Sequence, residues 1–376
     1  MNILILHGSS DLYGASKILL VTVNALAKRK HHVTVVLTEP GPLAAILQEE
    51  GIEVVFIRLG ILRRKYKSIS GMANRVLVLR KAYLSIKKLI REKQADLVYS
   101  NTTAVLAGAY AARSTRTRHI WHVHEIIEQP GWLYRFLGRS LQRYSDTVIA
   151  VSQAVKTSWM RFVEEAKIKV VYNGIDYSPC LEAVDTLRKE LNIAPDTVVI
   201  GMIGRVHHWK GQGYFMQIAA RLVKKFPQLR FVMIGDAFPG NEYLYKELDA
   251  IREKEQLDDC LTDLGYRTDT PSLLKGFDIL VLPSILPDPF PTVILEAMAC
   301  GKPVVATSHG GALEMVDEGV TGILIPPNDV ATAASLMESL ITNKDKRLQL
   351  GMAGRAKVLS QYTQEAFEKK ILNILE

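Results

Sequence analysis

The sequence predicts an α/β protein with two doubly wound parallel sheets. Short β-branched or apolar runs alternate with longer helical patterns along all 376 residues. Most of these runs are apolar at consecutive positions, as in strands that helices cover on both faces. At about 150 residues per domain, the length corresponds to two sizeable domains.

The alternation is regular in both halves of the chain. The expected strands of the first half are residues 3–6, 33–37, 54–57, 97–100, 119–123 and 148–151. Those of the second half are residues 198–203, 231–234, 261–265, 279–282, 304–307 and 323–325. Helical patterns between them include residues 15–28, 76–93, 215–225 and 330–340, which is βαβ repetition twice over.

Turn signals place the domain boundary. Asn173-Gly174, Ser178-Pro179 and Ala194-Pro195 cluster within residues 173–197, as in a connecting segment. We therefore predict domains at residues 1–172 and 198–358, joined by a linker at 173–197. Residues 359–376 are predicted to form an amphipathic helix that packs back on the N-terminal domain.

Composition and charge exclude several classes of protein. With 48% hydrophobic and 23% charged residues, the chain is not disordered. Three widely spaced cysteines exclude a disulfide scaffold and suit a reducing cytosol. The opening apolar run is too short for a signal peptide, and no run approaches the roughly 20 apolar residues of a membrane span. We expect a cytoplasmic protein.

The net charge of +8 is unevenly spread. Residues 1–175 carry +14 and residues 176–376 carry −6, which indicates that the first domain meets an anionic partner. An anionic membrane surface is one candidate. Nucleic acid is not expected, because no platform of interleaved aromatic and basic residues is evident.

Ligands of open parallel sheets bind beyond the carboxyl ends of the strands. We expect the active site in a cleft between two such edges, one from each domain. The residues that this rule selects are His7, Asn101, His124, Ser152, Arg205, Asp236, Ser284 and His309.

The segment 288–303 is the most informative. It predicts a short helix from about Thr292, because prolines precede this residue and Gly301 and Pro303 follow the helical pattern. Glu296 is the only charge of that helix, and the residues three and four positions away from it offer no acidic or basic partner. It is either a carboxylate at the domain edge or an acceptor for ligand hydroxyls. Asp288 precedes the helix start, where backbone N–H groups favour an anion.

A second cluster follows the strand at residues 198–203. Arg205 and Lys210 lie five positions apart on a loop, where they could clamp a diphosphate or be an ordinary solvated pair. Gly14 permits close backbone approach near a helix N-terminus. The chain has no Gly-x-Gly-x-x-Gly, which counts against an NAD-dependent dehydrogenase. It also has no Asp-x-Asp pair, which weakens the case for a nucleotide sugar held by a metal ion.

His122 and His124 end a predicted strand and project to the same side. A metal pair is conceivable, but no third ligand is evident, so zinc is a minor alternative.

Together these motifs resemble the retaining, nucleotide-sugar-dependent glycosyltransferases of the GT-B fold, family 4 (glycosyl transferases group 1). The resemblance runs nearly end to end. It rests on Gly14, His124-Glu125, Asn173-Gly174-Ile175-Asp176, Gly204-Arg205, Lys210-Gly211, Leu264-Gly265-Tyr266, Pro283-Ser284, Asp288 with Glu296, and Gly310-Gly311 with Glu314.

The resemblance implies a role for each matching residue. Arg205 and Lys210 bind the donor diphosphate, Glu296 the ribose hydroxyls, and Asp288 the hydroxyls of the transferred sugar. His124 lies near the reacting sugar, so that it, Asp288, Arg205 and Lys210 form the catalytic set. The remaining donor contacts implied are Gly14 at the diphosphate, Phe290, Thr292 and Val293 at the sugar and phosphate, and Gly265 and Tyr266 at the base.

Three residues depart from the family pattern. Asp288 replaces the usual Glu, Pro291 stands where Gly is usual, and Tyr13 replaces the first of two glycines. The first two lie by the sugar and leave the donor identity open among UDP-, GDP- and dTDP-sugars.

The implied activity is metal-independent retaining transfer (EC 2.4, hexosyltransferase type), with no cofactor. The sugar would move to a hydroxyl of a glycan or lipid-linked glycan in cell-envelope polysaccharide or lipopolysaccharide synthesis. The basic segment 62–67 and helix 75–93 either face an anionic membrane surface as a peripheral contact or pack as ordinary structure. A GT-B-fold sugar-nucleotide epimerase, a phosphorylase, and a disabled nucleotide- or glycan-binding protein are the alternatives.

Overall fold

The computed structural model of the protein describes residues 1–61, 69–127, 129–238 and 240–376. They form two units, one of Met1–Ile175 with Gln364–Glu376 and one of Asp176–Thr363. The boundary falls inside the predicted linker 173–197. Residues 176–363 belong to unit 2, whose first helices are α7 (Ser178–Glu182) and α8 (Leu187–Glu190).

Unit 1 is built on a seven-stranded parallel sheet in the order β3-β2-β1-β4-β5-β6-β7. Its strands are β1 (Asn2–His7), β2 (His32–Leu37), β3 (Glu53–Phe56), β4 (Leu97–Asn101), β5 (Arg118–Val123), β6 (Thr147–Ala150) and β7 (Ile168–Val170). The strand order reverses between β1 and β4, where His7 is the register partner of Asn101. This is the topological switch point, at which doubly wound sheets bind ligands. Strand β7 was not predicted. It is an edge strand of only three residues with Lys169 at its centre.

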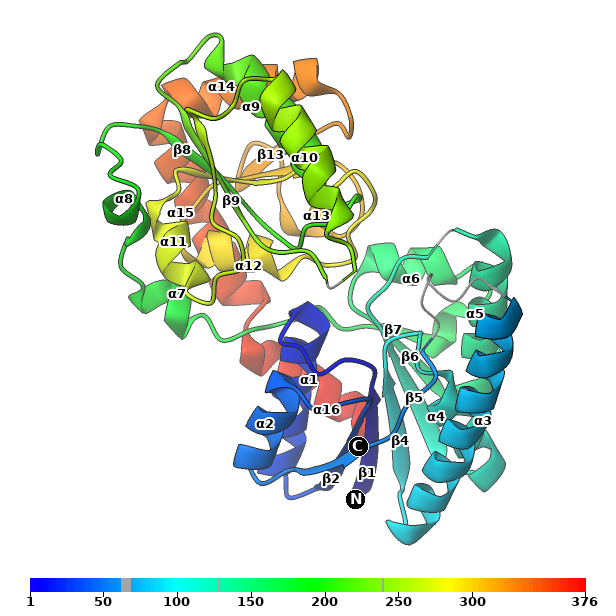
Figure 1. Ribbon diagram of the computed structural model, residues 1–376. Helices are drawn as coiled ribbons and strands as arrows, with labels where there is room; N and C mark the ends of the chain where they lie inside the picture. The colour runs from blue at the N-terminus through cyan, green and yellow to red at the C-terminus, as the bar shows by residue number, and fades with distance from the viewer. Residues whose placement is uncertain (62–68, 128, 239) are drawn as a thin grey trace. The chain divides into compact units, whose positions relative to one another are not determined.

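Helices cover both faces of this sheet (Figure 1). One layer contains α1 (Gly14–Lys28), α2 (Pro42–Glu49) and α16 (Gln364–Leu375), and the other α3 (Ile69–Glu92), α4 (Leu106–Thr115) and α5 (Gly131–Tyr144). Successive β1 side chains serve opposite layers, since Ile3 and Ile5 join one core cluster and Leu4 and Leu6 the other. Between β6 and β7 lie α6 (Gln153–Trp159) and the short η2 (Glu165–Lys167).

Unit 2 is built on a six-stranded parallel sheet in the order β10-β9-β8-β11-β12-β13. Its strands are β8 (Val199–Ile203), β9 (Arg230–Ile234), β10 (Leu261–Asp263), β11 (Ile279–Leu282), β12 (Val304–Thr307) and β13 (Gly322–Ile325). Its helices after α8 are α9 (Gln212–Val223), α10 (Tyr243–Lys254), α11 (Thr270–Gly276), α12 (Thr292–Ala299), α13 (Ala312–Met315), α14 (Val330–Thr342) and α15 (Lys344–Gln361). The predicted fold class, two doubly wound parallel sheets, is confirmed.

The predicted tail helix 359–376 is two elements. Helix α15 ends at Gln361 in unit 2, and α16 belongs to unit 1, where Phe367 and Ile371 are buried against α1. Within the described residues, no helix is long and apolar enough to cross a membrane.

Candidate active site

Two groups that were predicted to bind different parts of the donor are paired in unit 2. The Lys210 Nζ donates to the Asp288 Oδ2 at 2.5 Å, and only 6% of Asp288 is exposed. The carboxylate compensates the lysine charge, as a buried charge requires.

Close backbone packing holds Lys210 near the β11 edge. The next residue, Gly211, precedes α9 with φ of 83°, and a Cβ there would lie 1.9 Å from the carbonyl oxygen of Pro283. Only glycine fits both the conformation and the contact. The loop after β8 can therefore approach the loop after β11.

The Asp288 loop rests on a glycine pair. The Gly311 N–H donates to the Asp288 carbonyl at 2.7 Å, and a Cβ on Gly310 would lie 2.5 Å from that same oxygen. Gly310-Gly311, which the resemblance singled out only as a motif, thus supports the backbone that carries the acidic side chain.

Arg205 has a different neighbour. Its guanidinium lies 3.5 Å from the ring centre of Phe238, in a cation–π contact, and Gln212 donates to its carbonyl oxygen at 2.8 Å. Phe238 was not among the predicted residues, because a ring in a loop far along the chain carries no spacing signal. The contact holds the guanidinium against the ring face.

Helix α12 presents its N-terminus at the same strand edge. It begins at Thr292, its N-cap Pro291 makes no side-chain hydrogen bond, and its first turn has no acidic residue. The positive end of the helix is thus not neutralised by its own sequence. Proline at the N-cap removes an N–H that the helix does not need. Phe290 is buried edge-to-face on Tyr362, and Thr292 and Val293 are half-buried.

Glu296 has polar neighbours that its own helix does not provide. It is half-buried, and its charge adds to the effect of burial in raising the pKa of Tyr177. It also contributes to the raised pKa of the Cys180 thiol, after the larger effects of Cys300 and burial. Tyr177 and Cys180 come from the α7 region, so helical spacing around Glu296 could not show them.

The turn after β10 presents the predicted base-binding residues. Gly265 has φ of 60°, its N–H donates to the Asp263 carboxylate at 3.0 Å, and its carbonyl accepts from Gly235 at 2.8 Å. The Tyr266 ring that follows is 56% exposed. The backbone of this turn is fixed while the ring is open to solvent.

Two further edge residues of unit 2 lie together. The His309 Nε2 is 2.9 Å from the Ser284 carbonyl oxygen, so Nε2 carries a proton. Burial lowers the pKa of His309, which keeps the imidazole neutral.

His124 lies beyond β5 in unit 1. It is half-buried, and its Nε2 is 2.8 Å from the Asn101 Oδ1. Burial first, then the neighbouring His122 and His7, lower its pKa well below 6.5. His124 is therefore neutral at pH 7. Gly14 begins α1, and the N-cap Tyr13 makes no side-chain cap hydrogen bond.

His122 is a buried structural partner of Tyr99. Its Nδ1 bonds the Tyr99 hydroxyl, and its ring centre lies 4.1 Å from that of His124. Across the described ranges, no three His, Cys, Asp or Glu side chains are grouped so that they could hold a metal ion.

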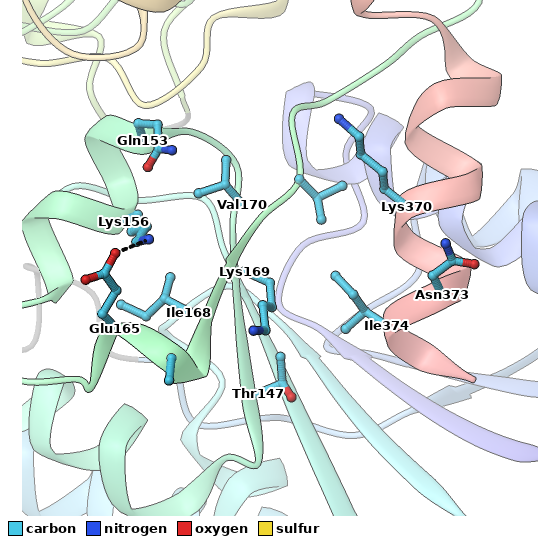
Figure 2. A pocket seen from close by; sticks show the side chains of 12 residues that line it. Thr147, Gln153, Lys156, Glu165, Ile168, Lys169, Val170, Lys370, Asn373 and Ile374 are labelled. Carbon is cyan, nitrogen blue, oxygen red and sulfur yellow. Dashed lines mark hydrogen bonds and ion pairs between the residues drawn. The ribbon is translucent and has the colours of Figure 1, made fainter.

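A groove of about 760 Å³ lies elsewhere in unit 1, along β7 between α6 and α16 (Figure 2). Lys156 pairs with Glu165 on one side, and Lys370 and Asn373 line the other. None of the predicted site residues lines it.

Family profiles cover most of the chain. The profile described as "Glycosyltransferase Family 4" matches residues 13–178, and "Glycosyl transferases group 1" matches residues 183–357. The chain belongs to the GT-B glycosyltransferases of family 4. The family and the fold inferred from the motifs are confirmed, and retention of configuration stays a prediction.

This family 4 glycosyltransferase has relatives with named activities. It is 25% identical to the Escherichia coli UDP-Gal:alpha-D-GlcNAc-diphosphoundecaprenol alpha-1,3-galactosyltransferase, over 85% of this chain and 82% of that protein. It is 26% identical to the Salmonella typhimurium lipopolysaccharide 1,2-N-acetylglucosaminetransferase, over 77% and 76%. Anabaena Alr3699/HepE in complex with UDP-glucose matches at a TM-score of 0.86 and 28% identity, over 100% and 99% of the two chains.

Proposed function

We propose that this glycosyltransferase moves a sugar, with retention of anomeric configuration, from a nucleoside-diphosphate sugar to a glycan hydroxyl. The observation that carries the proposal is the Lys210–Asp288 pair in the unit that presents the uncapped N-terminus of α12. Relatives that use UDP-Gal or bind UDP-glucose support a UDP-sugar donor. Relatives that act on a diphosphoundecaprenol-linked sugar or on lipopolysaccharide support a lipid-linked or cell-envelope glycan acceptor.

The charges account for the departure of the leaving group. The bond between the anomeric carbon and the diphosphate oxygen breaks, and the acceptor oxygen bonds to that carbon on the same face. The acceptor proton passes to the departing diphosphate. Lys210, Arg205 and the α12 N-terminus stabilise the negative charge that develops there, without requiring a metal ion. As Lys210 turns to phosphate, Asp288 becomes free to accept hydrogen bonds from sugar hydroxyls.

We further propose that the outer face of the α3–α5 layer meets an anionic membrane surface. Helix α5 has no acidic residue, its exposed face carries Trp132 (64% exposed) and Phe136, and Arg135, Arg139 and Arg143 are exposed beside them. Such a combination of aromatic and basic side chains suits an interfacial helix.

Helix α3 adds exposed apolar and basic side chains to the same layer, namely Val76, Leu77, Leu84, Arg80, Lys81, Lys88 and Arg91. On another side of that helix, Ala82, Ile86 and Ile90 pack into the core. The basic segment 62–67 lies outside the described residues.

A ligand and product panel tests the donor assignment. Thermal shifts are measured with UDP, GDP, dTDP and their sugars, and the stabilising donors are then incubated with free and lipid-diphosphate-linked sugars in excess chelator. We expect one nucleotide class to stabilise the protein and a glycosylated acceptor to form with chelator present. An isomerised sugar, or a sugar phosphate formed from inorganic phosphate, would instead identify an epimerase or a phosphorylase. Binding without turnover would identify a disabled site.

A further inference from the structure

A chain of buried polar side chains connects His124 to a carboxylate in the first loop of unit 1. His124 Nε2 lies 2.8 Å from Asn101 Oδ1, and Asn101 Nδ2 lies 3.0 Å from His7 Nδ1. His7 Nε2 lies 3.0 Å from Ser16 Oγ, which is 3.0 Å from Asp11 Oδ1. His7, Asn101 and Ser16 are each at most 2% exposed. The segments come from β1, the first turn of α1, the end of β4 and the residue after β5.

The orientation of the Asn101 amide follows from the Ala15 carbonyl. That oxygen can only accept, and it lies 3.3 Å from the Asn101 Nδ2, so the nitrogen faces it. The second Nδ2 hydrogen then points to His7 Nδ1, and the amide oxygen faces His124. Because that oxygen only accepts, His124 must donate from Nε2.

The tautomer of His7 follows from the orientation of the Asn101 amide. Its Nδ1 accepts from Asn101, so the proton of the neutral ring lies on Nε2 and is donated to Ser16. A proton on Nδ1 could reach the Asn101 carbonyl at 3.4 Å, but it would face the Nδ2 hydrogens at 3.0 Å. Ser16 donates onward to Asp11, which also accepts from the Tyr13 N–H and the Ser9 hydroxyl. Every hydrogen bond of the chain is donated toward Asp11.

His7 and His124, the two histidines of this hydrogen-bonded series, are neutral. Burial is the main cause that lowers the pKa of His7, to about 4, and the pKa of His124 well below 6.5. The titratable groups around His124 are His7, His122 and Glu125, with Tyr99 bonded to His122. None of them supplies a negative charge to His124 at hydrogen-bonding distance, since Glu125 accepts from the backbone N–H of His124 rather than from its ring. Neutral His124 with a proton on Nε2 has a lone pair on Nδ1.

We propose that Asn101 and His7 are positioning residues that hold His124 as the Nε2–H tautomer, with Nδ1 presented to accept a hydrogen bond from a substrate hydroxyl. The inference rests on the proposed function for the identity of that hydroxyl, but the tautomer itself does not depend on it. A tautomer fixed in advance avoids reorganising the ring during the reaction. Were the amide reversed, Nε2 would be the acceptor and Nδ1 the donor, and the ring would offer the hydroxyl the opposite polarity.

The experiment combines histidine ¹⁵N NMR with kinetics on the full chain. In the wild type at pH 7 we expect the His124 signals of the Nε2–H tautomer, in protein that contains no donor. Asn101→Asp places a carboxylate at Nε2, so we expect His124 to gain a proton between pH 5 and 8 and the rate profile to gain an ionisation. Turnover at pH 7 should fall about tenfold, as for partners that orient a functional histidine, with KM for the donor little changed.

Ser100→Ala is the matched control, because it removes a buried hydrogen bond, to His119, from the same strand but outside the chain. It should leave the His124 signals and the pH profile unchanged. Should Asn101→Asp fail to fold, Asn101→Ala removes the amide oxygen that faces His124 Nε2 and should yield mixed His124 tautomers. A wild-type His124 protonated on Nδ1 or on both nitrogens would overturn the proposal, as would Asn101→Asp and Asn101→Ala spectra like the wild type. Nucleotide binding by the same samples reports on the proposed function separately.

Discussion

Unit 1 and unit 2 share a doubly wound topology but present opposite kinds of chemistry at their switch points. Beyond β1 and β4, unit 1 presents a series of hydrogen-bonded side chains that runs from Asp11 to His124 and whose two histidines are neutral. Beyond β8 and β11, unit 2 presents Arg205, Lys210 and Asp288, which carry full charges. The difference teaches that one parallel scaffold can serve orientation in one copy and charge stabilisation in the other, according to the residues after its strands.

The largest expected effect concerns the two cations of unit 2, which we propose stabilise the leaving group. Removing either one, by Arg205→Met or Lys210→Met, should lower turnover about a hundredfold, or about 3 kcal/mol, because a contact to developing charge is lost. Steady-state kinetics with saturating acceptor measure the effect. The control is Lys225→Met, which removes a cation from an exposed ion pair with Glu338. Since Lys210→Met leaves Asp288 buried without a partner, Lys210→Met with Asp288→Asn distinguishes misfolding from lost chemistry. Wild-type rates in both Met variants would refute the assignment.

The second test compares the two faces of unit 1. Reversing Arg135, Arg139 and Arg143 to Glu should weaken binding to anionic vesicles at least a hundredfold, at about 1 kcal/mol per basic residue near such a surface. Vesicle co-sedimentation at several salt concentrations measures it, and wild-type binding should fade as salt rises. The matched variant reverses Lys28, Lys369 and Lys370 on the α1 and α16 layer and should bind like the wild type. Equal loss in both triple variants would mean that net charge, not the α3–α5 face, governs binding.

A third and smaller effect is expected at Glu296. Replacing it by Ala should weaken donor binding about thirtyfold, or about 2 kcal/mol, through loss of hydrogen bonds to a charged acceptor. The melting temperature should change little, because the side chain is only half-buried. Calorimetric titration with the donor and thermal unfolding of the same variant separate the two outcomes. Strong destabilisation with unchanged affinity would make Glu296 a structural partner of Tyr177 instead.

The smallest effect concerns acid stability and distinguishes the units by their buried histidines. Burial lowers the pKa of His119 to about 4 and of His122 to about 3. The unfolded chain therefore binds protons below about pH 6.5 that the native chain does not. Stability is then complete above that pH and falls as the pH drops toward the native values, by about 1.4 kcal/mol per pH unit for each histidine.

His119→Gln isolates one such group. Between pH 7 and 5 its loss of unfolding free energy should be about 2 kcal/mol smaller than that of the wild type. The exposed His32→Gln serves as the control and should follow the wild-type curve. Denaturant unfolding at both pH values, with unit-specific proteolytic fragments identified by mass spectrometry, shows which unit opens. Earlier opening of unit 2 in acid would contradict the comparison.

Much of the fold could be predicted because consecutive apolar residues are a local signal. Runs such as those at β1, β4 and β11 reveal strands covered on both faces, and their alternation with helices sets the topology. That topology in turn selected His7, Asn101, His124, Ser284 and His309 as edge residues. Strand β7 was not predicted, because an edge strand of three residues with a central lysine contains no apolar run.

The sequence by itself determined the fold class, the family and the loops in which the site residues lie, because apolar periodicity and motif spacing are properties of neighbouring residues. Only the tertiary structure decided that Lys210 pairs with Asp288, that Arg205 lies over the Phe238 ring, and that the charge of Glu296 acts on the pKa of Tyr177. Such pairings join segments far apart in the chain, and spacing carries no record of them. The protonation of His124 belongs to the same class, because it depends on burial and on an amide oriented by the carbonyl of Ala15.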